Sequence, residues 1–341
     1  MLTCRAVDDS HESRWDAFVD HLKGGPYLYF AWKKAVEKAY NHKGFYLVAE
    51  EGDNIVGLFP LVLFNGFSGK SFVSLPFCDY GGVLALSEEV ATFLFSEVEK
   101  FLETSMKVKD LEVRFPSPPP FFPAQSGEIS KVRLILELPP SADILWKNLK
   151  AKVRSQVRRP TKDGAKALLG GMELLPAFYR VYLDNMHYLG SPPHSEKWFK
   201  EIMIAYGSRA KVGVVHLDGE PLAAGILLCS SNTVTIPWAS SRREYKKLSP
   251  NMLLYWTFLS FAADNDFKFF DFGRSSPGSG TYRFKKQWGA KEVPLYWYVS
   301  NGSPGMQGSI KVRSLIENIW RHLPKFFVNR LGPHLRSRIS L

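Results

Sequence analysis

The segment KVGVVHLDGEPLAAGILLCS, residues 211–230, decides the fold of this chain, because it has the pattern of a β-hairpin and the pattern occurs twice. An apolar run leads to a turn at Gly219, beside an aspartate, and a second apolar run follows. Glycine has no Cβ and readily adopts the positive φ angles of tight turns. The segment FYLVAEEGDNIVGLFPLVLF, residues 45–64, repeats the pattern around Gly52. We therefore expect a duplicated α/β unit.

The elements predicted around the two hairpins follow a similar order. In the first half, apolar periodicity predicts helices at 11–22, 29–40 and 88–104, and strands at 45–50, 55–64, 71–75, 83–86 and 110–115. In the second half it predicts helices at 175–190, 196–207 and 250–264, and strands at 233–241, 267–273 and 295–300 beside the hairpin. This order is that of the GNAT acyltransferase fold. We expect an α/β protein with mixed sheets, built from two tandem GNAT-like domains with a cleft between them.

Prolines mark the expected domain boundary. A strand is predicted at 132–138, and Pro139 and Pro140 directly after it cannot continue a sheet. We therefore predict three parts, which are an N-terminal GNAT-like domain at 1–140, a C-terminal GNAT-like domain at 141–305 and a basic amphipathic tail at 306–341.

Composition excludes several classes of protein. With 341 residues, 45% of them hydrophobic, the chain can form a large core, so intrinsic disorder is excluded. The apolar run at 55–64 is about half of the roughly 20 residues that a membrane-spanning helix needs. The three cysteines lie far apart without a CxxC pattern, which argues against a disulfide framework and a zinc site. No export signal is visible, and we expect a cytoplasmic protein.

A formal net charge of +11 favours anionic partners, namely RNA, phosphorylated metabolites or an anionic membrane surface, although a merely basic enzyme is an alternative. Seven cations and no carboxylate lie between 147 and 162, on a helix whose apolar stripe is Leu145, Leu149, Val153 and Val157 and which we expect Pro160 to end. In the tail, 316–341 is either an interfacial helix at the inner face of the membrane or a segment packed on the first domain.

The loop in FDFGRSSPGSGTYRFKKQWG, residues 270–289, does not match known phosphate loops. Gly273 and Gly278 have the spacing of a P-loop, but the lysine and hydroxyl that should follow are absent. The segment 242–251, where a GNAT enzyme would hold the pyrophosphate of acetyl-CoA, contains no glycine, although Ser249 is a good helix cap there. A degraded CoA site points to a different acyl donor.

Five segments together resemble the FemAB-like proteins, and most of all the branch associated with exosortase/PEP-CTERM exopolysaccharide systems. They are SFVSLPFCDYGGVL (71–84), KAKVRSQVRR (150–159), FYRVYLDNMHYLGSP (178–192), WASSRREYKKLSPNMLLYW (238–256) and FDFGRSSPGSGTYRFKKQWGA (270–290). The resemblance implies tandem GNAT domains that transfer an amino acid from aminoacyl-tRNA to an amine of a peptidoglycan precursor. It implies no cofactor other than the acyl donor. The coiled-coil arm of some relatives is missing, which leaves the tRNA donor open.

The resemblance also implies a reaction centre. The family pattern F-K-x-x-[FW]-G matches residues 284–289 and assigns Lys285 to the oxyanion or to the departing ribose oxygen. We predict Arg274 and Tyr282 as further catalytic residues. Arg274 either binds an anion or pairs with Asp271 to hold the loop. In an extended chain Tyr282 would face the same side as Phe284, either to bind substrate or to pack.

Eight residues are predicted to bind substrate. Arg154 lies on the basic helix, and the CDYGG segment presents Asp79 and Tyr80, although a plain turn aspartate is the alternative reading of Asp79. His187 stands near a position where many relatives carry a phosphate-binding arginine, or it is a surface histidine. The full set is Asp79, Tyr80, Trp32, Arg154, His187, Trp238, Asp271 and Trp288.

Three functions remain open at this point. The favoured one is N-acyl or aminoacyl transfer to an amine of a cell-envelope or exopolysaccharide-related acceptor, with tRNA or a lipid- or nucleotide-linked sugar or peptide precursor as partner. The second is an N-acyltransferase that uses acyl-CoA or an acyl-carrier protein. The third is an inactive GNAT pair that binds lipid-linked glycan or RNA.

Overall fold

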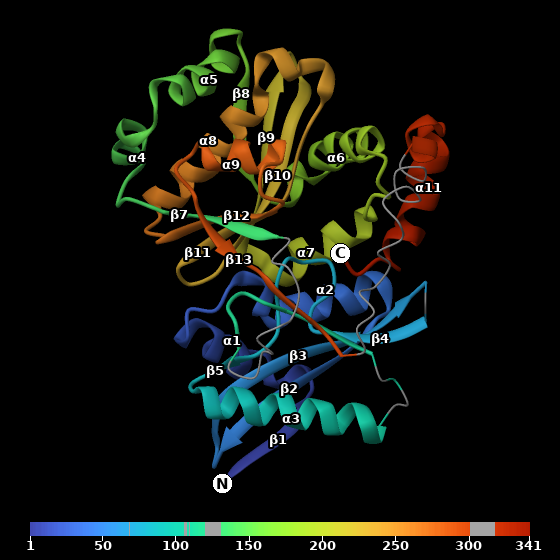
Figure 1. Cartoon of the computed structure of the whole chain (residues 1–341). Helices are drawn as coiled ribbons and strands as arrows, with labels where there is room; N and C mark the ends of the chain where they lie inside the picture. The colour runs from blue at the N-terminus through green and yellow to red at the C-terminus, as the bar shows by residue number, and fades with distance from the viewer. Residues whose placement is uncertain (68, 106–107, 109, 120–130, 301–317) are drawn as a thin grey trace. The chain divides into compact units, whose positions relative to one another are not determined.

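The computed structural model describes residues 1–67, 69–105, 108, 110–119, 131–300 and 318–341 (Figure 1). The chain divides into two compact units. Unit 1 comprises Met1–Val132, Val293–Gln307 and Ser337–Leu341, and unit 2 comprises Arg133–Glu292 and Gly308–Arg336. The chain passes from unit 1 to unit 2 after Val132, the first residue of the strand at 132–137, and the boundary at Pro139 and Pro140 stays a prediction. The expected boundary between 305 and 306 lies outside the described residues.

Unit 1 has a mixed sheet in the order β1-β2-β3-β4-β6-β14, with β5 paired to β3. Its strands are β1 (Leu2–Val7), β2 (Lys43–Glu51), β3 (Asn54–Gly66), β4 (Gly69–Val73), β5 (Leu84–Ala85), β6 (Leu111–Phe115) and β14 (Tyr296–Val299). Its helices are α1 (Glu12–His21), α2 (Phe30–Tyr40) and α3 (Glu88–Ser105). The hairpin predicted at 45–64 is the antiparallel pair β2 and β3, and Gly52 has the positive φ of 59° that its turn requires.

The two faces of this sheet are covered by different helices. Leu47 of β2 belongs to a core that includes Leu94 and Val98 of α3. The neighbouring Tyr46 points to the opposite face, where its ring packs on Trp15 of α1 and on Phe30 of α2. Strict alternation along a strand therefore places α3 on one face and α1 with α2 on the other.

Unit 2 has the second mixed sheet, in the order β13-β7-β12-β11-β10-β9-β8. Its strands are β7 (Val132–Glu137), β8 (Lys166–Gly170), β9 (Ala210–Leu217), β10 (Glu220–Cys229), β11 (Thr233–Ser241), β12 (Phe269–Ser275) and β13 (Lys291–Pro294). Its helices are α4 (Ala142–Asn148), α5 (Ala151–Lys162), α6 (Leu175–Leu189), α7 (Glu196–Tyr206), α8 (Pro250–Asp264), α9 (Gly280–Lys286) and α11 (Lys325–Arg336). The expected duplication is confirmed, because each sheet has an antiparallel hairpin followed by a parallel pair joined through a helix.

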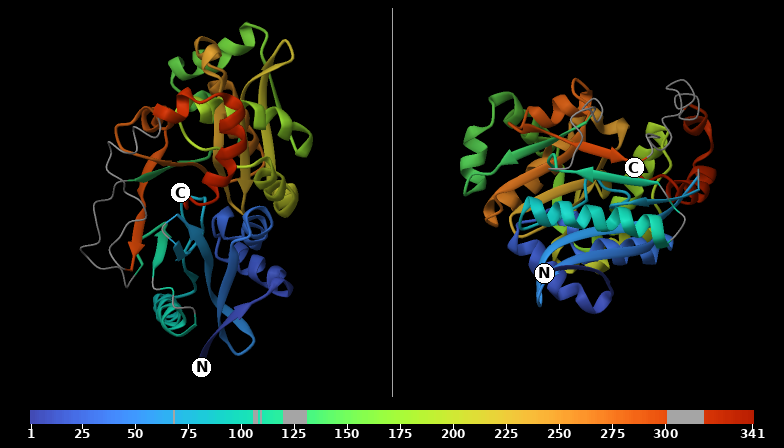
Figure 2. Two further views of the ribbon diagram at one scale, coloured as in Figure 1. Left: turned by 90° about the vertical axis from the view of Figure 1, so that its right-hand side faces the viewer. Right: turned by 60° about the horizontal axis from the view of Figure 1, so that its bottom comes forward.

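Helices also cover both faces of the second sheet, as Figures 1 and 2 show. A Cβ added to Gly213 or Gly225 would lie within 3.0 Å of the Phe258 ring, so glycine allows α8 to approach these strands closely. Ala239 pairs with Gly225, and its neighbour Trp238 therefore points to the other face of the sheet. There the Trp238 ring packs on Phe199 of α7. Alternation therefore places α7 on the face opposite α8.

The basic segment is two helices rather than the single one that we expected. Leu149 and Lys150 have extended ψ angles of 143° and 145°, which break the chain between α4 and α5. Pro160 does not end the helix but lies inside the last turn of α5. The four apolar residues of the predicted stripe are nevertheless all buried, because both short helices pack on the same core.

Candidate functional site

Lys285 is a buried lysine on the short helix α9. Only 8% of its surface is exposed, and its Nζ donates to the carbonyl oxygens of Gly273 at 3.1 Å and Arg274 at 2.8 Å. Successive carbonyls of a regular strand point in opposite directions. Gly273 has a φ of 74°, which breaks the strand geometry, and this break explains how both carbonyls reach one ammonium group. Lys285 is therefore held against the end of β12.

Asp271 supports the same strand end from inside the core. Its side chain is fully buried, and its Oδ2 accepts from Arg133 Nη2 at 2.7 Å and Nε at 3.0 Å. Its Oδ1 accepts from the backbone N–H of Gly273 at 2.8 Å. One interpretation of the sequence paired Asp271 with Arg274, but the cation that pairs with it is Arg133 of β7. A continuous polar chain thus runs from Arg133 through Asp271 and Gly273 to Lys285.

The pairing between β11 and β12 is short. Three residue pairs join these parallel strands, the last being Thr235 with Asp271, although both strands continue beyond this point. Gly273 and Arg274, which hold Lys285, lie two and three residues after the last pair. Ser275, the next residue, is buried, and its Oγ has no hydrogen-bond partner among the described residues. Ser275 therefore leaves an unsatisfied buried hydroxyl beside the residues that hold Lys285.

Unit 1 uses the corresponding position differently. β4 and β6 are also parallel, and they pair only at Phe72 with Leu111 and Val73 with Glu112. The chain then returns, and the N–H of Gly81 donates to the carbonyl of Arg114 on β6 at 2.8 Å. The loop that contains Gly81 therefore satisfies a backbone carbonyl at the end of β6, whereas the Lys285 side chain satisfies the carbonyls at the end of β12.

Tyr282 lies in a helix and not in the extended segment that we expected. Its segment is helical in α9 rather than extended, so the predicted shared face with Phe284 does not form. Its hydroxyl donates to Glu292, which also pairs with Lys286 at 3.2 Å. The hydrogen bond from Tyr282 lowers the pKa of Glu292, and Lys286 lowers it further. Tyr282 is thus held at the end of α9 by a carboxylate.

Trp288 follows α9 and is part of the core. Its ring stacks on Tyr255 of α8, and Phe284 packs edge-on against Tyr255 with a centroid distance of 4.9 Å. The indole N–H of Trp288 is buried without a hydrogen-bond partner among the described residues. This aromatic group fixes α9 on α8, and it therefore fixes the helix that carries Lys285.

His187 lies at a cavity of about 290 Å³ in unit 2, lined by the end of α6, the turn after β11 and residues before and in α11. His187 Nε2 donates to the carbonyl of Leu323 at 3.0 Å, so it holds the tail. Asp184 pairs with Arg242 at 3.1 Å and with Lys325 at 2.6 Å. The Arg243 guanidinium lies 4.4 Å from the ring centre of Tyr188. The cavity is charged and is rich in guanidinium groups.

The turn after β11 leads into α8 without the expected cap. Ser249 has a φ of 57°, and its side chain makes no capping hydrogen bond, although Pro250 begins the helix as predicted. Residues Arg243–Leu248 form a short 3-10 helix instead of a glycine-rich loop. The backbone here therefore lacks the glycines that let a phosphate-binding turn close around its ligand.

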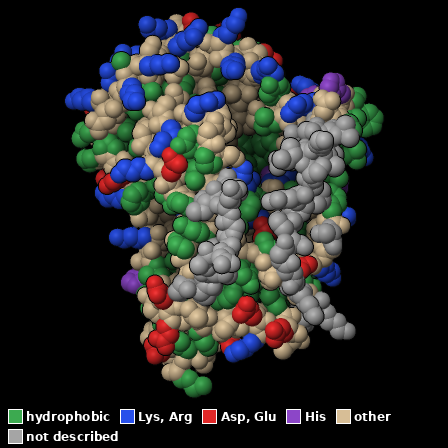
Figure 3. Space-filling view, viewed as in Figure 1, with side chains coloured by type: hydrophobic (Ala, Val, Ile, Leu, Met, Phe, Trp, Pro, Cys, Tyr) green, Lys and Arg blue, Asp and Glu red, His purple; other side chains and the backbone are tan. Residues whose placement is uncertain are grey.

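Arg154 and Trp238 have clear structural contacts. Arg154 Nη1 donates to the carbonyl of Leu149 at 2.7 Å and to that of Lys147 at 3.2 Å, so it caps the end of α4. The other six cations of the basic segment are exposed, and Figure 3 shows Lys and Arg side chains gathered around α5. Trp238 is 9% exposed and packs edge-on against Phe199 and Trp198.

The residues predicted in unit 1 share one aromatic group. Trp32 is fully buried, and its indole N–H donates to the carbonyl of Pro76 at 3.0 Å, which holds the start of the CDYGG turn. Tyr27 packs edge-on against both Trp32 and Tyr80, at 5.0 Å in each case. Asp79, between these contacts, is half-buried. Trp32 thus supports the turn on which Asp79 and Tyr80 lie.

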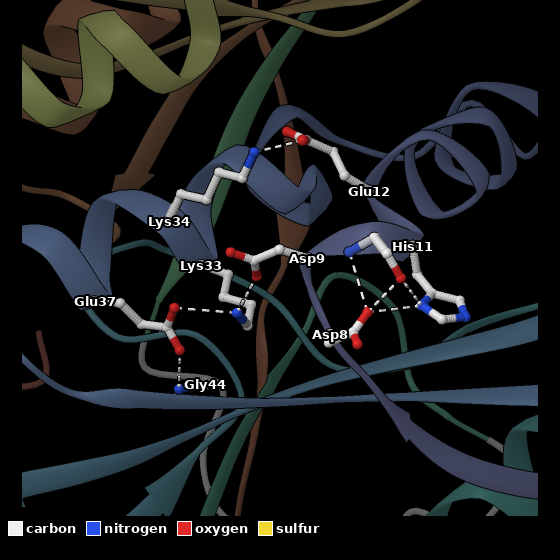
Figure 4. A network of polar contacts seen from close by, with 9 residues as sticks. Asp8, Asp9, His11, Glu12, Lys33, Lys34, Glu37 and Gly44 are labelled. Carbon is white, nitrogen blue, oxygen red and sulfur yellow. Dashed lines mark hydrogen bonds and ion pairs between the residues drawn. The ribbon is translucent and has the colours of Figure 1, made fainter.

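A lysine that the sequence pattern did not single out lies on the helix of Trp32 (Figure 4). The Lys33 ammonium is buried and donates to Asp9 at 2.7 Å and to Glu37 at 3.0 Å. Burial lowers the pKa of Lys33, but the two carboxylates outweigh this effect and raise it. Glu37 also accepts from the N–H of Gly44 at 2.8 Å. This network joins α2 to β2 and has a structural role.

Known proteins with a similar sequence or structure belong to the GNAT fold. Residues 147–286 match the family model described as the acetyltransferase (GNAT) domain. No curated protein matches the sequence. The structure of FemX is similar with a TM-score of 0.68 and 13% identity, over 92% of this chain and 100% of that one. A tandem GNAT protein from the clavulanic acid biosynthesis pathway is similar with a TM-score of 0.54 and 11% identity, over 89% and 100%.

A third similar structure is the C-terminal domain of a putative lysylphosphatidylglycerol synthetase from Agrobacterium fabrum. Its TM-score is 0.56 at 15% identity, over 86% of this chain and 92% of that one. At such identities the likeness concerns the fold alone. Residues 147–286, which contain β12, α9 and Lys285, therefore match the GNAT acetyltransferase domain, and the chain as a whole has the fold of the tandem GNAT proteins.

Proposed function

We propose that this chain transfers an aminoacyl group from aminoacyl-tRNA to an amine of an envelope or exopolysaccharide-related acceptor, of the kind that exosortase/PEP-CTERM systems handle. The observation that carries the proposal is the buried ammonium of Lys285, held by two carbonyls at the end of β12 inside the acetyltransferase domain. A buried cation costs free energy unless it is compensated. A buried ammonium group at this strand end fits a catalytic use.

The proposed reaction needs no nucleophile from the enzyme. The acceptor nitrogen attacks the carbonyl carbon of the aminoacyl ester and forms a C–N bond, which gives a tetrahedral oxyanion. The bond between that carbon and the ribose oxygen then breaks, and the proton lost by the amine balances the one gained by the ribose oxygen. The positive charge of Lys285 stabilises the oxyanion, and it does so more strongly in a buried site than in water.

The choice of donor rests on the cation distribution. The exposed cations on and beside α5 suit a polyanion such as tRNA, and the turn before α8 lacks the glycines of a CoA site. The lysylphosphatidylglycerol synthetase among the similar structures is named for a lipid that carries a lysyl group, which favours aminoacyl transfer. Acyl-CoA is the second candidate donor, because the matching family is described as an acetyltransferase.

The test compares envelope polysaccharides and lipid-linked intermediates by mass spectrometry in cells that lack the gene and in cells that carry the wild type or a variant. The wild type should add the mass of an amino acid or acyl group to one class of molecule. Lys285→Ala should reduce this product by about a hundredfold, the usual effect of removing an oxyanion donor.

Arg283→Ala is the matched control, because it removes an exposed cation from the same helix. It should retain the product. The added mass distinguishes an amino acid from an acetyl group. An identical pattern with and without the gene would overturn the proposal and favour an inactive binding protein.

A further inference from the structure

Helix α11 exposes large apolar side chains. Phe326 is 67% exposed, Phe327 51% and Leu331 49%, and Ile319 in the helical residues 318–322 before α11 is 55% exposed. Exposed apolar residues are common singly, but a group of this kind on one short helix marks an interaction surface. Figure 3 shows hydrophobic side chains on the surface at the upper right, where Figure 1 places α11.

These residues form one face of the helix. At 100° per residue, Phe326, Arg330, His334, Phe327 and Leu331 fall on one continuous arc, and all of them are exposed. Val328 and Gly332 fall on the opposite side, and both are buried. The usual arrangement of an amphipathic helix is therefore reversed, because α11 exposes two phenylalanines and buries a glycine.

The buried side is anchored to unit 2. A Cβ on Gly332 would lie 2.3 Å from Pro193, so the helix backbone packs directly on that residue. Arg336 Nε donates to His194 at 3.1 Å, and Lys325 pairs with Asp184 at 2.6 Å. These contacts fix the orientation of α11, so the apolar face is presented and is not free to turn inward.

The segment that carries this face has charges of one sign. Residues 318–341 contain no Asp or Glu, and their cations are Arg321, Lys325, Arg330, Arg336 and Arg338. Arg330 lies between Phe326 and Leu331 on the exposed arc. A second copy of the chain would bring the same cations face to face, which opposes self-association. An apolar face with cations around it is instead complementary to lipid tails covered by anionic headgroups.

We propose that α11 docks this protein on an anionic membrane surface, with Phe326, Phe327 and Leu331 inserted at the headgroup boundary and Arg330 among the lipid phosphates. α11 has 12 residues, whereas a spanning helix needs about 20, so it lies in the interface plane. Within the described part of the chain, no helix has the length and apolar character to cross a bilayer. Docking requires no substrate, so it is independent of the proposed reaction.

Vesicle flotation of the full chain tests this proposal. Wild-type protein should float with vesicles of phosphatidylcholine and phosphatidylglycerol, and much less with phosphatidylcholine alone. Replacing Phe326→Ser and Phe327→Ser together should lower the partition coefficient at least about tenfold, because two phenylalanines lose their burial. Arg330→Glu should lower it about tenfold at low salt, and the loss should shrink as salt rises.

Ile204→Ser is the matched control, because Ile204 is 59% exposed on α7 of the same unit. It should float like the wild type. Far-UV circular dichroism verifies that each variant is folded. The proposal is overturned if the wild type does not float with the anionic vesicles, or if the double variant floats like the wild type. It is also overturned if sedimentation shows that the phenylalanines hold two copies of the chain together.

Discussion

At the scale of single residues, Asp271 connects the core to the candidate site. Its carboxylate is shared between Arg133 and the N–H of Gly273, and the carbonyl of Gly273 in turn accepts from Lys285. A buried ion pair contributes little net stability, but removing one partner leaves an uncompensated charge. Asp271 is therefore a positioning residue for Lys285, in addition to any contact with substrate.

We expect Asp271→Asn to lower the free energy of unfolding by about 3 kcal/mol, because Arg133 loses its buried counter-ion while the Gly273 N–H keeps an acceptor. Denaturant unfolding measures this change. Glu196→Gln is the control, since it breaks the exposed pair with Lys200 and should cost less than about 1 kcal/mol. Equal losses in the two variants would contradict a special role for the buried pair.

His194 makes the stability depend on pH. Burial lowers the pKa of its imidazole well below the ordinary value, and the nearby Arg336 lowers it further. An unfolded histidine titrates near pH 6.5, so below that pH the unfolded chain binds more protons than the folded one. The stabilising effect of the neutral form is therefore lost as the pH falls through about 6.5. Burial also lowers the pKa of His42, which acts in the same direction.

We expect the free energy of unfolding to fall between about pH 7 and about pH 5, by up to about 1.4 kcal/mol per pH unit for each histidine. His194→Gln should make this slope shallower, because a glutamine amide does not titrate and its oxygen can still accept from Arg336. Unfolding at several pH values measures the slope. The same slope in the variant and the wild type would show that His194 is not responsible.

At the scale of elements, the cations of the basic segment have two different roles, although the sequence does not distinguish them. Arg154 caps α4 and acts within the fold, whereas cations such as Lys152 and Arg159 on α5 are exposed. Only the exposed group is available to a polyanion. Electrostatic binding of this kind depends on salt, because each neutralised phosphate releases condensed counter-ions.

Replacing Lys152→Glu and Arg159→Glu together should weaken tRNA binding and make the plot of log affinity against log salt shallower, by about one unit for each phosphate that is no longer neutralised. Lys197→Glu with Lys200→Glu makes the same change in net charge on α7 and should leave the slope unchanged. Filter binding over a salt series measures both. Equal effects from the two pairs would indicate that net charge, and not α5, binds the RNA.

At the scale of the whole molecule, late segments of the chain complete the unit formed by its beginning. β14 pairs with β6, and residues 337–341 bond to the centre of unit 1. The Ser340 carbonyl accepts from the N–H of Phe77 at 2.6 Å, and its Oγ accepts from the buried Arg114 at 3.0 Å. Residues 318–336 belong to unit 2 and residues 337–341 to unit 1, and a separate tail at 306–341 stays a prediction.

Deletion of residues 337–341 should lower the free energy of unfolding of unit 1 by about 3 kcal/mol, because the hydrogen bonds that Ser340 makes with Phe77, Glu112 and Arg114 are lost. The deletion also removes the hydrogen bond between His42 and the carbonyl of Ser337, at 2.8 Å. The fluorescence of Trp297, whose ring centre lies 5.7 Å from the Arg114 guanidinium, reports on this region. Removing the fully exposed Met1 should have no effect. Unchanged unfolding after the deletion would show that the segment contributes nothing.

The sequence by itself determined the hairpins, the order of helices and strands and the doubled fold, because glycine turns and apolar periodicity act over a few neighbouring residues. It also singled out Lys285, whose catalytic role stays a prediction. It could not determine that Asp271 pairs with Arg133, which is 138 residues away, nor that β7 joins the second sheet. Only the tertiary structure decides such pairs, because they depend on which strands become neighbours in a sheet, and no local pattern records that choice.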